Sequence, residues 1–63
     1  MPIILAKIME GRSQEKIDAF IEAVTDAAHK TLDAPRESVR VLVEEVPKSH
    51  WGIGGKSARS LGR

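Results

Sequence analysis

The chain has 63 residues, of which ten are basic and nine acidic, and its net charge is +1 at neutral pH. This balance argues against binding to nucleic acid through bulk positive charge, and no basic stripe alternates with aromatic residues. The apolar runs are far shorter than a membrane span and the N-terminus lacks a signal-peptide pattern, so we expect a cytoplasmic protein.

We expect a single domain, residues 1–63, with a small core. A domain of this size buries only about 60% of the surface that its unfolded chain exposes. The sequence contains no cysteine that could form a disulfide, and the spacing of His29 and His50 is not that of a zinc site, so no metal is expected. Association with further copies of the chain is the remaining source of stability.

The first half of the chain predicts a strand and a long helix. Ile3 to Met9 is rich in branched apolar residues and precedes the turn sequence EGRS, a pattern typical of a strand. Ser13 is the predicted N-cap of the helix, and the sequence DAP at residues 33–35 ends it. Apolar residues recur at helical spacing between these points, namely Ile17, Phe20, Ile21, Val24, Ala28 and Leu32.

The second half predicts another strand and a hairpin. In SVRVLVEEV, residues 38–46, the valines at 39, 41 and 43 belong to one face and Arg40, Leu42 and Glu44 to the other. The sequence WGIGG predicts a short hairpin, followed by a weakly ordered basic tail.

Strand, helix and strand together form a β-α-β unit of the α+β class. Its right-handed crossover makes the two strands parallel in one sheet. One helix covers only one face of such a sheet, so the face that carries Leu42 requires another subunit.

Pro2 stands at the start of the first strand, where a residue without a backbone N–H is tolerated. Taken alone, this position indicates only the opening of an edge strand. Removal of Met1 would, however, expose a secondary amine at the chain terminus, and such an amine can carry a proton.

Four features occur in a fixed order: the N-terminal proline, the EGRS turn, the sequence DAPRESVRV and the sequence WGIGG. Together they resemble the 4-oxalocrotonate tautomerase family, also called 2-hydroxymuconate tautomerases, over essentially the whole chain. The resemblance implies a β-α-β protomer that assembles through its sheets into dimers and then into a homohexamer of three dimers. It also implies cofactor-free isomerisation of a small dicarboxylate, as in aromatic hydrocarbon catabolism.

The resemblance also implies roles for individual residues. Pro2 is the catalytic base after processing, Arg12 matches the arginine of the EGRS turn, and Arg40 matches the arginine early in the second strand. Trp51 stands where the best-known members have a phenylalanine, and Met9 replaces a leucine near the pocket. Both are therefore expected to contact the substrate.

These residue types suit proton transfer. A solvated proline amine is mostly protonated at neutral pH, whereas apolar surroundings and nearby cations lower the pKa of an amine. Trp51, Ile3 and Met9 supply the apolar surroundings, and the two arginines supply the cations. We expect Pro2 to move a proton from the 2-hydroxyl of a dienol diacid to a distant carbon. Guanidinium groups are also well suited to hold the two carboxylates.

Strand geometry predicts that the site is shared. Pro2 and Arg12 lie at opposite ends of one strand, on the order of 25 Å apart at about 3.3 Å per residue. A six-carbon substrate cannot span that distance, so the two residues must come from different subunits if both act on one molecule. Arg40 starts the parallel strand and lies at the Pro2 end; the subunit that supplies it stays open.

Each candidate also has a purely structural interpretation. Pro2 opens an edge strand, Arg12 is a surface cation, and Trp51 packs at a subunit interface. Arg40 either discourages sheet aggregation or pairs with Glu44.

Two alternative functions remain. The first is a related hydratase, dehalogenase or decarboxylase that acts on a small unsaturated acid, with Glu10, Glu44 or Glu45 activating water. The second is a non-catalytic subunit of an oligomer.

Overall fold

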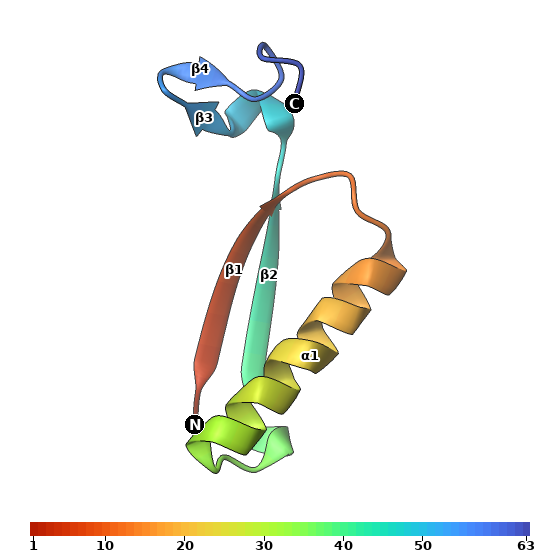
Figure 1. The fold of residues 1–63 in the computed structure, drawn as a ribbon, viewed down its shortest axis with the longest axis vertical. Helices are drawn as coiled ribbons and strands as arrows, with labels where there is room; N and C mark the ends of the chain where they lie inside the picture. The colour runs from red at the N-terminus through yellow and green to blue at the C-terminus, as the bar shows by residue number, and fades with distance from the viewer.

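The computed structural model describes all residues from Met1 to Arg63. It contains two longer strands, one helix, two short 3-10 turns and a C-terminal hairpin, which confirms the expected β-α-β order (Figure 1). The elements in chain order are β1 (Ile3–Met9), α1 (Gln14–Leu32), η1 (Arg36–Ser38), β2 (Arg40–Val46), η2 (Lys48–His50), β3 (Gly52–Ile53) and β4 (Lys56–Ser57).

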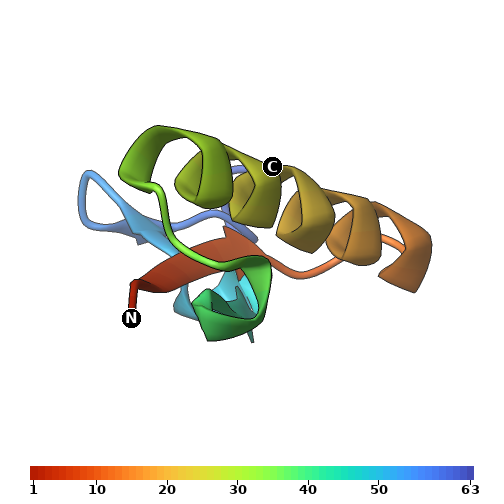
Figure 2. The ribbon, with the colours of Figure 1, turned by 90° about the horizontal axis from the view of Figure 1, so that it is seen from below.

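The two longer strands form a parallel sheet. Their register runs from Ile3 opposite Arg40 to Met9 opposite Val46. The helix α1 connects the strands and covers one face of the sheet, as Figure 2 shows from the end of the strands. The expected alternation is confirmed, because Val41 and Val43 are half-buried whereas Leu42 is exposed.

The ends of α1 follow from local chemistry. The Ser13 hydroxyl accepts a hydrogen bond from the Lys16 backbone N–H at 3.3 Å, as an N-cap does. At the other end Asp33 adopts a left-handed conformation with φ of 55°, and Pro35 follows it. No helix combines the length and the apolar character that are needed to cross a membrane.

The core is small. Its buried residues are Ile17, Ala28, Val39 and Ala58. Phe20 and Leu32 belong to the apolar stripe of the helix, yet they are 41% and 64% exposed in the single chain. Strands lie only about 4.8 Å apart, and a sheet of two strands is therefore too narrow to cover the whole apolar stripe of a helix.

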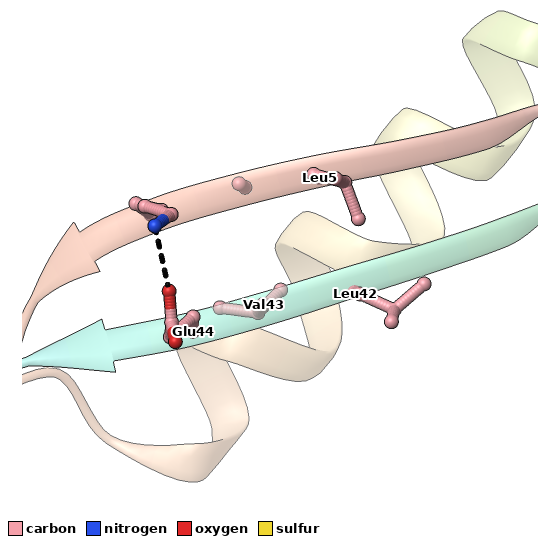
Figure 3. Close-up of a pocket in the computed structure, with 6 residues that line it drawn as sticks. Leu5, Leu42, Val43 and Glu44 are labelled. Carbon is pink, nitrogen blue, oxygen red and sulfur yellow. Dashed lines mark ion pairs between the residues drawn. The ribbon is translucent and has the colours of Figure 1, made fainter.

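The sheet face opposite α1 is uncovered (Figure 3). Ile3, Leu5 and Leu42 are 62%, 72% and 53% exposed there. Further along this face the Lys7 ammonium forms an ion pair with Glu44 at 3.2 Å. Glu44 is thus the partner of Lys7, and the interpretation of Arg40 as its partner is wrong.

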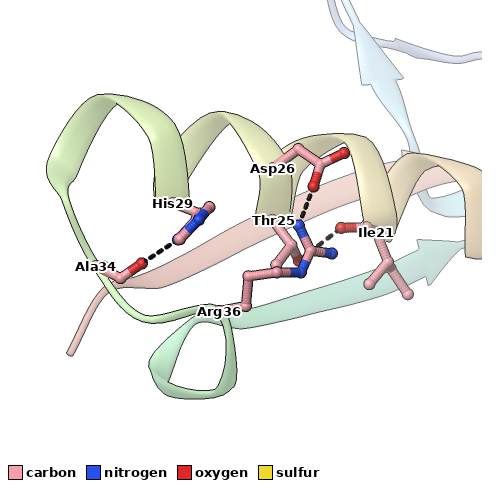
Figure 4. Close-up of polar contacts among 6 residues, drawn as sticks. All are labelled: Ile21, Thr25, Asp26, His29, Ala34 and Arg36. Atoms are coloured by element: carbon pink, nitrogen blue, oxygen red, sulfur yellow. Dashed lines mark hydrogen bonds and ion pairs between the residues drawn. The ribbon is translucent and has the colours of Figure 1, made fainter.

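Polar contacts fasten the connection between α1 and β2 to the helix (Figure 4). Arg36 forms an ion pair with Asp26, and the His29 ring Nδ1 donates to the Ala34 carbonyl at 2.6 Å. The connection leads directly into β2, so these contacts help to position Arg40 at the start of that strand.

The C-terminal segment lies beyond the carboxyl ends of β1 and β2 (Figure 1). Its strands β3 and β4 form the expected hairpin, with Gly54 and Gly55 at positive φ in the turn. The residues that follow were expected to be weakly ordered, and this is wrong. Ala58 is fully buried and donates to the Trp51 carbonyl at 2.7 Å, and the Arg63 N–H closes a turn on the Ala58 carbonyl at 3.0 Å.

Candidate active site

Pro2 and Arg40 are neighbours at one end of the sheet. The Arg40 backbone N–H donates to the Pro2 carbonyl at 3.0 Å, and Arg40 pairs with Ile3 in the strand register. Pro2 is half-buried. The contact joins backbone atoms of the parallel ladder. It therefore keeps the two residues adjacent regardless of their side-chain conformations.

The Arg40 guanidinium has no carboxylate partner in the chain. It donates to the Glu37 carbonyl at 2.6 Å, which folds the side chain over the η1 turn. The only ion pairs in the chain are Lys7–Glu44 and Arg36–Asp26, so no carboxylate neutralises Arg40.

Arg12 and Met9 lie at the opposite end of the sheet. Gly11 follows β1 with φ of 122°, a conformation that favours glycine, and the chain turns there into the helix cap. Arg12 donates from Nη1 to the Met9 carbonyl at 3.1 Å and forms no ion pair. A second guanidinium without a carboxylate partner therefore stands where β1 ends.

Trp51 also belongs to this second end. It is half-buried and follows η2, which leaves the carboxyl end of β2 through Pro47. Of the three residues expected to give Pro2 apolar surroundings, only Ile3 lies near it within one chain. Met9 is the last residue of β1, and Trp51 follows η2, beyond the carboxyl end of β2.

The five candidate residues thus form two separate groups. Pro2 and Arg40 make up the first, and Met9, Arg12 and Trp51 make up the second. The seven residues of β1 separate them by about 25 Å, at about 3.3 Å per residue. No single chain places all five around one small molecule.

The second group adjoins a groove of about 280 Å³ between the end of β1 and the first turns of α1. The residues that line it are Ile8, Arg12, Lys16, Ile17 and Phe20. Sequence reasoning missed Lys16, because its charge is typical of a solvated helix face. The spacing of four residues between Lys16 and Phe20, which places them on one side of the helix that follows Arg12, was the available signal.

The carboxylates considered for activating water do not approach Pro2 within the chain. Glu44 pairs with Lys7, and Glu45 lies opposite Ile8 in the half of the strand far from Pro2. Glu10 follows the last residue of β1. No group of three or more acidic, histidine or cysteine side chains gathers as a metal site would require.

The parallel β-α-β unit with its C-terminal hairpin defines the chain as a small α+β protein. Comparison with known proteins identifies its family. A family model described as a tautomerase enzyme matches residues 2–60. The chain belongs to this tautomerase family and is an isomerase.

Individual relatives agree with this assignment. The 2-hydroxymuconate tautomerase of Stutzerimonas stutzeri is 51% identical over 63 residues, which cover 100% of both chains. The crystal structure of TomN, a 4-oxalocrotonate tautomerase homologue in the tomaymycin biosynthetic pathway, superposes with a TM-score of 0.91. It is 47% identical, and the match covers 94% of this chain and 91% of TomN. A heterohexamer 4-oxalocrotonate tautomerase from Chloroflexus aurantiacus J-10-fl superposes with a TM-score of 0.92 at 36% identity. The match covers 97% of this chain and 98% of that chain.

Proposed function

We propose that this chain converts a dienol dicarboxylate of the 2-hydroxymuconate type to its conjugated 2-oxo isomer, with the Pro2 amine as the base after Met1 is removed. The observation that carries the proposal is the ladder contact that places Pro2 beside the unneutralised Arg40. The name and full-length similarity of the Stutzerimonas stutzeri relative support the substrate class.

The site is completed by a second copy of the chain. The sheet contains only β1 and β2, so the outer edge of β1 is open to another strand. An antiparallel neighbour along this edge brings its Arg12 to the Pro2 end of the first chain. The uncovered face with Ile3, Leu5 and Leu42 offers a further apolar contact. In a homohexamer of single-domain copies, residues 1–63, other copies cover both the open edge of β1 and the uncovered sheet face.

The reaction moves one proton and needs no change in oxidation state. The Pro2 nitrogen takes the proton of the 2-hydroxyl, and the carbon–oxygen bond becomes a carbonyl. The two conjugated double bonds give way to one between carbons 3 and 4, and carbon 5 receives the proton back from Pro2. Arg40 holds the carboxylate beside the 2-oxygen and stabilises the charge that develops on it. Arg12 of the second copy holds the far carboxylate.

The same assembly favours a neutral Pro2 amine. Nearby guanidinium groups and apolar side chains both disfavour the protonated form and lower the pKa of an amine. Arg40 and Ile3 act from the same chain, and Arg12, Met9 and Trp51 act from a neighbour. A base is most effective when its pKa lies near the working pH.

The direct test blocks the Pro2 nitrogen. A variant that keeps one additional residue before Pro2 converts the amine to an amide, and we expect loss of at least about 100-fold in kcat for 2-hydroxymuconate, in the range that general-base catalysis contributes. Processed Pro2→Ala, which retains a primary amine, serves as the milder companion. Unchanged turnover in the blocked variant, or turnover of 3-chloroacrylate alone by the processed protein, would contradict the proposal.

A further inference from the structure

The groove at the end of β1 holds a second cation beside Arg12. Lys16 and Phe20 lie one helical turn apart on the same side of α1, and both line the groove together with Arg12. The arginine precedes the helix cap and the lysine lies in the first turn. The cationic side chains of Arg12 and Lys16 therefore line the same groove.

Neither cation has a carboxylate partner. Lys16 takes part in no ion pair, and no acidic residue lines the groove. The nearby Asp18 accepts a hydrogen bond from the Gln14 amide at 2.9 Å. The groove thus carries two positive charges that remain available to an anion.

The walls between the charges are apolar. Ile17 is buried, Ile8 is half-buried, and Phe20 presents 41% of its surface. An apolar hollow with a few convergent polar groups is typical of small-ligand sites. A carboxylate has about four acceptor positions, so it can accept from a guanidinium and an ammonium at once.

We propose that Lys16 is a specificity-determining residue. It binds, together with Arg12, the substrate carboxylate farthest from the reacting 2-oxygen, and so makes the enzyme prefer dicarboxylates to monocarboxylates. This inference rests on the proposed function, because Arg12 and Lys16 reach the substrate of another copy only in the shared site. Lys16 lies far from the reacting atoms and therefore affects selection of the substrate rather than proton transfer itself.

The experiment compares two substrates that differ only at the far end. One is 2-hydroxymuconate, and the other is 2-hydroxypenta-2,4-dienoate, the same dienol without the second carboxylate. We expect Lys16→Gln to lower kcat/KM for the diacid about tenfold, the order of one hydrogen bond to a charged group, and to leave the monoacid unchanged. Lys16→Arg should restore most of the preference.

Lys30→Gln is the matched control, because Lys30 carries the same charge near the other end of α1 and lines no groove. It should leave both substrates unchanged. Equal losses on the diacid and the monoacid for Lys16→Gln, or the same loss in Lys30→Gln, would overturn the proposal. If Lys16→Gln does not assemble, Lys16→Met, which keeps the aliphatic stem, takes its place.

A binding measurement separates this inference from the proposed reaction. trans,trans-Muconate is a dicarboxylate of the same length without the reacting hydroxyl, and calorimetry measures its Kd. Lys16→Gln should weaken its binding about tenfold. If that Kd is unchanged while the blocked Pro2 variant is inactive, only the role of Lys16 fails. If the Kd weakens while blocking Pro2 has no effect, only the proton-transfer proposal fails.

Discussion

The backbone of Arg40 donates a hydrogen bond to the carbonyl of Pro2 at 3.0 Å, at the opposite end of the sheet from Arg12. Parallel pairing of β1 with β2 brings the start of one strand beside the start of the other. The same pairing keeps the first residues of both strands away from the turn that follows β1, where Arg12 lies. One arginine therefore accompanies Pro2 in its own chain, and the other is available only from a neighbour.

Loss of the Arg40 guanidinium should impair the chemical step. We expect Arg40→Gln to lower kcat by about 100-fold, the order found when one stabiliser of a developing oxyanion is removed. Steady-state kinetics on 2-hydroxymuconate give the value. Arg63→Gln, at the far end of the C-terminal segment, is the control and should match the unaltered enzyme. A rise in KM with unchanged kcat would show that Arg40 only binds substrate.

The uncovered sheet face should be required for assembly. Leu5 is 72% exposed in the isolated chain, and Leu5→Lys would place a charge in any contact made through this face. Native mass spectrometry should show smaller species, with activity reduced in parallel. Ala27→Lys, at an exposed position of α1, is the control. An unchanged native mass for Leu5→Lys would exclude this face from the interface.

The helix cap should contribute to stability. Ser13→Ala removes the oxygen that accepts from the Lys16 N–H, and such a change costs about 1 kcal/mol. Thermal unfolding at fixed protein concentration should show a lower Tm. Ser49→Ala removes a hydroxyl that forms no hydrogen bond within the chain and should leave the Tm unchanged. Equal Tm values for the two variants would refute the capping role.

The pH dependence should report the Pro2 amine. Only its neutral form accepts a proton, so kcat/KM should rise with pH through the pKa of this amine and level off above it. The cationic and apolar surroundings proposed for Pro2 lower that pKa, and we expect the rise near neutrality. The profile is measured on processed protein. A rise centred at about pH 8 or above would contradict a lowered pKa, because an ordinary terminal amine titrates at about 8.

Local patterns predicted much of the fold. The run of branched apolar residues before the EGRS turn predicted the observed bounds of β1, and Ser13 and residues 33–35 delimit α1 as expected. The second strand begins at Arg40 rather than at residue 38, because Ser38 and Val39 complete the η1 turn. These features depend on neighbours in sequence, which is why the sequence reveals them.

Features that depend on tertiary contact were harder to predict. Phe20 fits the helical stripe, but the narrow sheet leaves it exposed beside a groove. Ala58 gives no sequence signal, yet the hairpin encloses it and orders the segment that follows. Lys16 lines a groove only because the end of β1 packs beside the first turns of α1, a contact that the sequence does not reveal.

Mixing two defective variants tests the shared site most directly. The blocked variant, which keeps one additional residue before Pro2, lacks the base but retains Arg12, and Arg12→Ala lacks the distal cation but retains the Pro2 amine. If each site takes these residues from two copies, random mixing in equal amounts should restore about a quarter of the sites, because half of the symmetric pairs are mixed and each has one intact site. Mass spectrometry verifies the exchange of subunits. Mixed assemblies with no more activity than the separate variants would contradict a site divided between copies.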